Sequence, residues 1–201
     1  MGVRELTIAG AWELPSTIHR DDRGAFLESY RADSLSEAIG HRFDLAQMNV
    51  SISRRGVVRG IHYADVPPSQ AKYVQCLRGA IIDFVVDIRV GSPTFGQWEG
   101  VRLDDVTRSA LYISEGLGHA FVALEDDTTV GYLVSEPYNA SREHGISPLD
   151  PQVGLEFPLP RDELVLSDKD RDAPSLAEAL AGGTLPSHVH ALTYLRELAD
   201  R

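Results

Sequence analysis

The sequence of 201 residues has a single cysteine, Cys76, so no disulfide can form within the chain. It has no apolar run near the roughly 20 residues that a membrane-spanning helix needs, and its first residues lack the pattern of a secretion signal. No stretch is rich in Lys and Arg, and the formal net charge is −11, which argues against a nucleic-acid backbone as partner. We therefore expect a soluble, cytoplasmic protein that binds neither nucleic acid nor membrane, with Cys76 buried.

Short apolar runs separated by Gly, Pro, Asp and Ser fill the middle of the chain. In residues 80–90 the side chains of Ile82, Phe84 and Val86 recur at every second position, which is the period of a strand with one apolar face. Further strands are predicted at residues 45–53, 72–77, 98–103, 110–114, 120–124 and 129–135. Many short strands with close turns indicate an all-β sandwich or barrel.

Helical patterns are confined to the edges of this β region. They occur at residues 33–40, at residues 175–183 just after Pro174, and at residues 188–201. The second of these ends on two glycines, as a helix end commonly does. We expect one domain over residues 1–201, with short peripheral helices and a helical C-terminal segment from about residue 174.

A small β-barrel or jelly roll commonly holds one small ligand in its mouth, where inward side chains of several strands converge. Functional polar residues should then occupy alternating positions inside strands. Gln47, Asn49 and Ser51 have this spacing, which puts all three on one face of a strand.

His62 is the first candidate for chemistry, and three interpretations of it compete: a structural histidine, a metal ligand or a general base. A metal-binding jelly roll usually presents His-x-His followed by a Glu, and a further His from a later strand. Position 64 is Ala, no Glu follows soon after, and His119 could supply only one more ligand. We therefore expect no bound metal.

A general base needs a carboxylate on its other ring nitrogen to fix the tautomer and stabilise the imidazolium. The pKa of a free histidine already lies near 6.5, close to a neutral working pH. The spacing of the sequence does not choose among the candidate carboxylates, which are Asp83, Asp87, Asp168 and Asp170.

Four other residues have both a structural and a functional interpretation. Lys72, at the start of a predicted strand, is either a solvated strand-edge lysine or a charge that stabilises an enolate. Tyr132, within a predicted strand, is either a packing residue or a proton donor. Arg23, beside a glycine in a turn, and Arg59 are either surface ion-pair residues or bidentate phosphate ligands.

Six segments together carry a resemblance to a known family over nearly the whole chain. They are DDRGAFLESY, QMNVSISRRGVVRGIHY, PPSQAKYVQCLRGAIIDFVVDIRVGSPTFGQW, LYISEGLGHAF, GYLVSEPYNASREHGI, and LSDKD with the RDAP that follows it. In order and spacing they resemble the dTDP-4-dehydrorhamnose 3,5-epimerase family. This resemblance implies a jelly-roll (cupin-like) fold, a homodimer, no metal or other cofactor, and epimerisation of a dTDP-linked 4-keto-6-deoxy sugar.

The resemblance also implies a role for each matching residue. His62 would be the base, with Asp170 preferred over Asp83 as the carboxylate that orients it. Lys72 would stabilise the enolate and Tyr132 would be the acid on the other face. The implied substrate-binding residues are Arg23, Phe26, Glu28, Gln47, Asn49, Ser51, Arg59, His119, Tyr138, Glu143 and Lys169. Of these, Arg23, Phe26 and Glu28 would reach the nucleotide of the partner subunit, and Arg59 would lie beside the diphosphate.

The sequence departs from the family pattern at a few positions. Ala64 and Asp65 stand where many members have Gln, and Gly118 and Ala120 stand where others have Ala and Gly. These departures fit a relative that inverts only C3 or only C5, as in antibiotic deoxysugar pathways. Two rivals remain: a non-catalytic sugar-nucleotide binder on the same barrel, and a metal-dependent cupin isomerase or dioxygenase.

Overall fold

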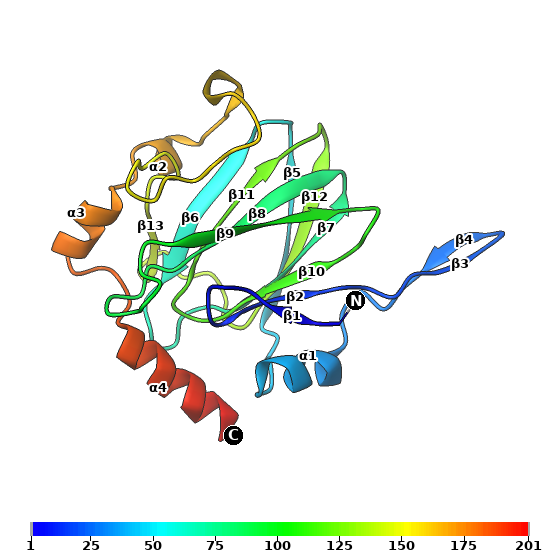
Figure 1. Cartoon of the computed structure of the whole chain (residues 1–201), viewed down its shortest axis with the longest axis horizontal. Coiled ribbons are helices and arrows are strands. Elements are labelled where there is room, and N and C mark those ends of the chain that lie inside the picture. The colour runs from blue at the N-terminus through cyan, green and yellow to red at the C-terminus, as the bar shows by residue number, and fades with distance from the viewer. Residues whose placement is uncertain (1, 201) are drawn as a thin grey trace.

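Two antiparallel sheets face each other in the computed structural model, which describes residues 2–200 (Figure 1). The six-stranded sheet contains, in spatial order, β1 (Arg4–Glu5), β2 (Ala11–Leu14), β10 (Ala110–Ile113), β7 (Lys72–Arg78), β12 (Thr128–Val134) and β5 (Gln47–Ser53). The five-stranded sheet contains β13 (Glu143–Gly145), β6 (Val58–Ala64), β11 (Gly118–Ala123), β8 (Ala80–Val86) and β9 (Trp98–Asp104). From β5 to β12 the chain changes sheet at every connection except β8 to β9, as in a jelly roll. The expected all-β jelly-roll fold is confirmed.

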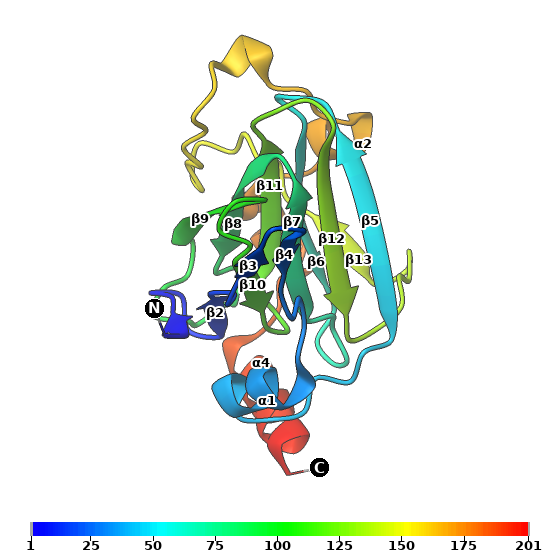
Figure 2. The same ribbon diagram turned by 90° about the vertical axis from the view of Figure 1, so that its right-hand side faces the viewer.

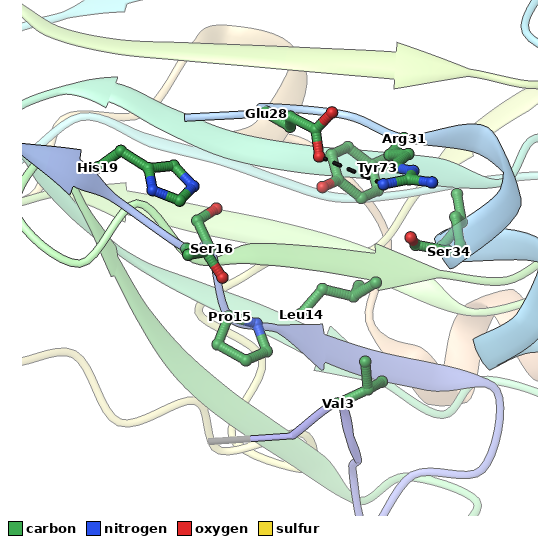
Figure 3. Close-up of a pocket in the computed structure, with 11 residues that line it drawn as sticks. Val3, Leu14, Pro15, Ser16, His19, Glu28, Arg31, Ser34 and Tyr73 are labelled. Atoms are coloured by element: carbon green, nitrogen blue, oxygen red, sulfur yellow. Dashed lines mark ion pairs between the residues drawn. The ribbon is translucent and has the colours of Figure 1, made fainter. Parts of the chain in front are cut away.

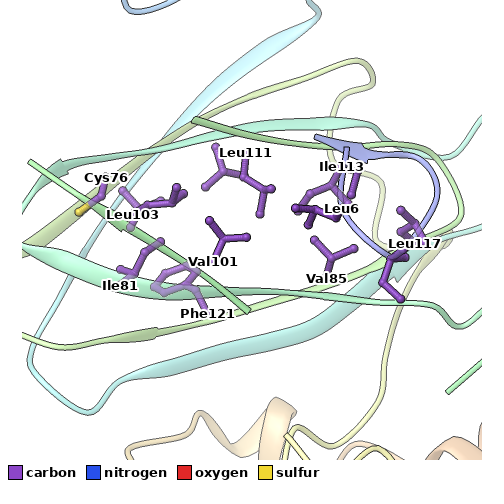
Figure 4. Close-up of a cluster of buried hydrophobic side chains, with 14 residues drawn as sticks. Leu6, Cys76, Ile81, Val85, Val101, Leu103, Leu111, Ile113, Leu117 and Phe121 are labelled. Carbon is purple, nitrogen blue, oxygen red and sulfur yellow. The ribbon is translucent and has the colours of Figure 1, made fainter. Parts of the chain in front are cut away.

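The core lies between the two sheets (Figure 4). Val74 and Cys76 of β7 meet Ile81 and Val85 of β8 there, and Cys76 is buried as predicted. Lys72 and Asp83 are two residues away from these core positions on the same strands, so they share the inward face. One end of the interior is therefore polar while the middle is apolar.

The apolar face of β8 that the sequence predicts does not point into the space between the two sheets. Phe84 and Val86 point to the outside of the five-stranded sheet, where they pack with Ile146, Val153 and other residues of the C-terminal third of the chain. The strand ends at Val86, earlier than the alternation over residues 80–90 predicts. Both faces of β8 are thus covered.

The helices are short and lie outside the sheets. They are α1 (Ala32–Ile39), the 3-10 turn η1 (Arg161–Glu163), α2 (Asp168–Arg171), α3 (Leu176–Ala181) and α4 (His188–Ala199). The three helices expected from the sequence are present, and α3 has the capping box of Ser175 and Glu178. The short helix α2 is not predicted by periodicity. No helix among residues 2–200 is long and apolar enough to cross a membrane.

A hairpin of β3 (His19–Asp21) and β4 (Gly24–Phe26) projects away from both sheets (Figure 1). Its two strands pair only with each other among the described elements. Viewed from the side, α1 and α4 lie together at one end of the sandwich (Figure 2). The hairpin therefore leaves the body of the fold, while the helices cover one end of it.

Candidate active site

His62 lies in the middle of β6 and is paired with Asp170 of α2. The Nε2 atom of His62 is 2.6 Å from Oδ1 of Asp170, and the second oxygen of Asp170 accepts a hydrogen bond of 2.9 Å from the Ser167 hydroxyl. Burial raises the pKa of Asp170, but the hydrogen bond and charge of His62 and the hydrogen bond of Ser167 outweigh it and lower the pKa. The carboxylate is thus ionised at neutral pH and holds one nitrogen of the imidazole, leaving Nδ1 free to accept a proton.

A β-bulge brings His62 and Arg59 to the same side of β6. In the register with β11, His119 pairs with His62 and Phe121 with Arg59, so β6 spans three residues where β11 spans two. Gly60, inside the bulge, has a φ of +117°, and a Cβ there would lie 2.4 Å from the carbonyl oxygen of His119. Only glycine fits this position, and the extra residue puts the exposed Arg59 on the face of β6 that carries His62.

Lys72 begins β7, which is a central strand and not an edge. It pairs with Ile113 of β10 on one side and Val134 of β12 on the other, and it is 8% exposed. Burial lowers the pKa of the Lys72 amine, while the charges of Glu143, Asp83 and Glu115 oppose that shift. The interpretation as a solvated edge lysine is wrong, because the strand is covered on both sides.

Tyr132 of β12 pairs with Asn49 of β5 and Val74 of β7 and packs against the core between the sheets. Its side chain is half-buried. Burial raises the pKa of the phenol, and the charge of Arg59 opposes this shift. A tyrosine in this setting stays protonated through the neutral range, as a proton donor must.

The alternation in β5 is as predicted. Gln47, Asn49 and Ser51 are half-buried on one face, and Gln47 Nε2 donates a hydrogen bond of 2.5 Å to Asn49 Oδ1. The residues between them, Met48, Val50 and Ile52, are 57%, 56% and 67% exposed. The edge strand of the sheet therefore has a polar face toward the interior and an apolar face toward solvent.

Asp83, the second candidate partner of His62, is bound to another histidine. Its Oδ1 atom is 2.5 Å from Nε2 of His119, and Asp83 is fully buried. Asp87, also a candidate, forms a buried ion pair with Arg89, and Asp168 is paired with Arg171 at the surface. Of the four carboxylates that the sequence offers, Asp170 alone contacts His62.

The model of the dTDP-4-dehydrorhamnose 3,5-epimerase family matches residues 5–178. The chain belongs to this family. A dTDP-4-dehydrorhamnose 3,5-epimerase of Mycolicibacterium smegmatis is 56% identical over 98% of this chain and 97% of that protein. The crystal structure of a Mycobacterium tuberculosis epimerase superposes with a TM-score of 0.96 at 48% identity, covering 98% of this chain and 100% of that one.

Members with a narrower activity are almost as similar. A 3′-monoepimerase of Streptomyces bikiniensis, solved in complex with dTDP-quinovose, superposes with a TM-score of 0.94 at 47% identity over 98% of each chain. The chain is thus a sugar-nucleotide epimerase by family. Similarity alone does not separate the double from the single inversion, because both kinds of relative match at comparable identity.

Two other residues expected in the epimerase site line a cavity beside the end of β6, and a third lies on α2. Tyr138 and Glu143 line a cavity of about 190 Å³ together with Ala64 and Asp65, two of the positions that depart from the family pattern. Asp65 accepts a hydrogen bond of 2.7 Å from Nε2 of His144, the neighbour of Glu143 on β13. Lys169 is exposed on α2, directly before Asp170.

Three expected substrate-binding residues of the epimerase are not brought to His62 within this chain. Arg23 and Phe26 lie on the projecting hairpin, where the Arg23 side chain is 89% exposed and paired with Asp21. Glu28 follows the hairpin and lines a separate cavity of about 200 Å³ with Arg31 and Tyr73. Its carboxylate points toward Arg31, with which it forms an ion pair (Figure 3). Within one chain, Arg23 and Phe26 thus lie on an exposed hairpin, and Glu28 lines a cavity that does not include His62.

Two residues near the site were not among those predicted from the sequence. Ser167 fixes Asp170 by capping α2 and donating to its carboxylate, and the Ser-x-x-Asp spacing could have indicated it. Glu115 is a buried carboxyl group on which the charge of Lys72 acts, and only its place in an apolar stretch could have indicated it. Among residues 2–200, no group of three His, Cys, Asp or Glu side chains is arranged to hold a metal ion.

Proposed function

We propose that this epimerase acts on dTDP-4-keto-6-deoxyglucose and inverts C3 and C5 by moving protons alpha to the C4 ketone. The observation that carries the proposal is the His62–Asp170 pair, on a strand that faces Lys72 and Tyr132 from the other sheet. Protons beside a ketone are weak acids, so their removal needs a positioned base and charge stabilisation at the enolate oxygen. Both C3 and C5 flank the same ketone, so one base and one acid can serve each in turn.

In this mechanism His62 Nδ1 takes the proton, and the Asp170 carboxylate stabilises the imidazolium that forms. The ammonium group of Lys72 stabilises the negative charge that develops on the C4 oxygen. Tyr132 returns a proton from the opposite face, which inverts the centre. Before the second carbon reacts, His62 gives its proton to solvent and Tyr132 takes one from solvent. Each step uses only side chains of the protein, the substrate and solvent, so we expect no cofactor to be required.

The remaining polar residues bind the rest of the substrate. Gln47, Asn49 and Ser51 line the inner face of β5, and Arg59, beside Tyr132, is suited to the diphosphate because a guanidinium matches phosphate oxygens bidentately. The proposed contacts at the rim and around the sugar are made by His119, Tyr138, Glu143 and Lys169.

We further propose that the enzyme is a cytoplasmic homodimer of single-domain chains in which the hairpin completes the partner's site. Two features support an interface between copies: the exposed apolar face of β5, formed by Met48, Val50 and Ile52, and the exposed Phe26 on the hairpin, at 67% exposure. In such a dimer Arg23, Phe26 and Glu28 would contact the nucleotide bound to the other chain.

A narrower activity, the inversion of one carbon only, is the second candidate. The small residue at position 118, where other members have Ala, favours it. A Cβ at Gly118 would lie 2.7 Å from Ile61 Cγ2, and one at Gly60 would lie 2.7 Å from the side chain of Ala120. Alanine at position 118, as in other members, would thus press on Ile61 of β6, the residue next to His62.

The deciding experiment follows deuterium by NMR when dTDP-4-keto-6-deoxyglucose is incubated with the enzyme in D₂O. Deuterium at C3 and C5, with the doubly inverted sugar trapped by a ketoreductase, is the expected result. Exchange at one carbon only would make the enzyme a mono-epimerase. Exchange at neither carbon would contradict the proposed function and favour a non-catalytic binder. In a separate elemental analysis, a metal that is lost together with activity would favour a metal-dependent cupin.

A further inference from the structure

Glu115 lies behind Lys72 at the ends of three neighbouring strands. In the order β10, β7, β12, Lys72 begins the central strand and pairs with Ile113, the last residue of β10, and Val134, the last residue of β12. Glu115 follows Ile113 by two positions and Ser135 follows Val134 directly. The Ser135 hydroxyl accepts a hydrogen bond of 2.8 Å from the backbone N–H of Ala71, next to Lys72. The register thus gathers Glu115 and Ser135 around the start of β7.

The Glu115 carboxyl group is buried and incompletely satisfied. Glu115 is 2% exposed, and its Oε2 atom has no hydrogen-bond partner. The Ser135 hydroxyl and the backbone N–H of Glu115 provide its hydrogen bonds. A buried carboxyl group with a free oxygen is costly, so its retention calls for a favourable interaction that offsets the cost. The positive charge that acts on Glu115 is that of Lys72, which forms no ion pair within 4.0 Å among the described residues.

We propose that Glu115 is a positioning residue that keeps the Lys72 side chain charged, from the side of the strand ends and not from the substrate side. The inference deepens the proposed function, on which it rests, because a neutral Lys72 could not stabilise an enolate. The charges of Glu143 and Asp83 act on Lys72 more strongly than the charge of Glu115 does. However, Glu143 lines the cavity that contains Tyr138, and Asp83 is bound to His119. Of these three carboxyl groups, Glu115 neither lines that cavity nor binds a histidine.

The titration of Glu115 supports this role. Burial raises the pKa of Glu115 to about 7, while the hydrogen bonds and the charge of Lys72 oppose the shift and the charge of Glu136 adds to it. Glu115 is therefore mostly ionised above pH 7 and mostly neutral below it, which makes its support of Lys72 dependent on pH. The other titratable or charged groups around it are Tyr112, His41, Arg42, Asp44 and Tyr194.

Direct measurement of the Lys72 titration is unusually clean in this chain, because it contains only two lysines, Lys72 and Lys169. Protein labelled with [ε-¹³C]lysine should give two side-chain signals, and Lys169→Arg assigns them. In Glu115→Gln the titration midpoint of Lys72 should fall by about one pH unit or more, since a negative neighbour is lost. The exposed Lys169 should not move. An unchanged Lys72 midpoint would overturn the inference.

The pH dependence of catalysis gives a second readout, since glutamine mimics a protonated glutamate. The ratio of kcat in Glu115→Gln to kcat in the wild type should be near one at pH 6, where Glu115 is neutral in both. It should fall by about tenfold at pH 8.5, with KM little changed. Any effect of pH on His62 enters both enzymes equally and cancels in the ratio. A merely structural defect would lower the ratio at every pH.

Two controls keep the outcomes separate. Asp150→Asn removes another buried carboxylate, which accepts the Leu176 N–H at 2.6 Å, so it should lower stability without moving the Lys72 signal. Ser135→Ala should lower the Lys72 midpoint by less than Glu115→Gln does. It replaces Glu115→Gln as the test if Glu115→Gln does not fold. A lowered Lys72 midpoint with a flat activity ratio would support the inference about Glu115 and contradict the catalytic role of Lys72 in the proposed function.

Discussion

His62 and Asp170 are separated by 108 positions in the chain, yet the His62 Nε2 and Asp170 Oδ1 atoms are 2.6 Å apart. The contact joins a strand of the sandwich to a four-residue helix in the C-terminal segment, and Ser167 fixes the carboxylate by capping that helix. The base is thus oriented by a part of the chain that packs on the outside of the sheet. Folding of the C-terminal segment and formation of a competent base are therefore coupled.

Replacement of His62 tests the base itself. His62→Asn should lower kcat by at least about 10²-fold, because general base catalysis contributes about 10²–10⁴. The fold and the affinity for dTDP should be retained, since the imidazole touches only the sugar in the proposed complex. Turnover and solvent exchange measured by NMR, with dTDP affinity by calorimetry, check this. Near-normal turnover would show that another group is the base.

Substitution of Asp170 and of Asp83 shows which of the two carboxylates orients His62. Asp170→Asn should lower kcat by about 10²–10⁴-fold at nearly constant KM, because the imidazolium loses its counter-charge. Asp83→Asn should instead raise KM, because Asp83 contacts His119, a proposed binding residue. Steady-state kinetics of both variants compares them. The opposite pattern would assign the orienting role to Asp83.

Much of the fold follows from local patterns that the sequence displays. The alternation in β5, the apolar runs of β7 to β12 and the terminal glycines after α3 are short-range features, and each marks an element that the sequence predicts. The burial of Cys76 also follows from its apolar neighbours. These predictions succeed because propensity and periodicity act within a few residues.

The arrangement of the site depends on contacts over long distances in the chain. No spacing rule distinguishes Asp170 from Asp83 as the partner of His62, because the choice depends on how residues 146–176 pack on the outer face of the sheet. The bulge at Gly60 and the central place of Lys72 depend on strand pairing in the same way. Family resemblance supplied the preference for Asp170, since periodicity alone could not.

Removal of the Tyr132 hydroxyl should separate the two halves of the reaction. Burial raises the pKa of this phenol, so it is a protonated donor at neutral pH. Tyr132→Phe should still allow His62 to exchange substrate protons with solvent, while inversion falls by at least about 10²-fold. NMR in D₂O compares deuterium incorporation with product formation. Equal loss of both would contradict a separate acid on the second face.

The proposed exchange of hairpins between subunits predicts complementation. Arg23→Ala alone should raise KM strongly, and His62→Asn alone should be inactive. When the two variants are unfolded and refolded together, a mixed dimer has one site with both residues intact, so about a quarter of the wild-type activity per chain should return. The matched control is a mixture of His62→Asn with Asp170→Asn. Both residues belong to the site of their own chain, so mixing the two variants cannot produce an intact site.

In that control every site of a mixed dimer lacks either His62 or Asp170, so no activity should return beyond that of the Asp170→Asn chain. Complementation in the first mixture and none in the control would support a site shared across the interface. A monomeric chain, or no gain in the first mixture, would show that Arg23 does not act on the partner. Light scattering gives the oligomeric state of each sample.

The buried pair of Asp87 and Arg89 should make stability depend on pH in acid. Asp87 is fully buried, and its oxygens accept hydrogen bonds from Arg89, Ser92 and Thr94. Desolvation raises the pKa of Asp87, but these hydrogen bonds and the charge of Arg89 outweigh it and lower the pKa from 3.8 to about 2. A lowered pKa means that the unfolded chain takes up this proton before the native protein does.

The stabilising effect of this carboxylate is therefore fully present above pH 4 and is lost as the pH falls from about 4 toward 2. A shift of this size corresponds to about 2 kcal/mol of unfolding free energy. At pH 7, Asp87→Asn should lower the unfolding free energy by about 3–5 kcal/mol, because the Arg89 charge is left buried without its partner. The variant should also lose much of the wild type's dependence on pH between 4 and 2.

Urea unfolding at pH 7, 4 and 3 measures both effects on the unfolding free energy. The control is Asp44→Asn, which removes an exposed pair with Arg42 and should change neither. If Asp87→Asn kept the wild-type slope with pH, the acid sensitivity would have to come from another carboxylate, such as Asp170.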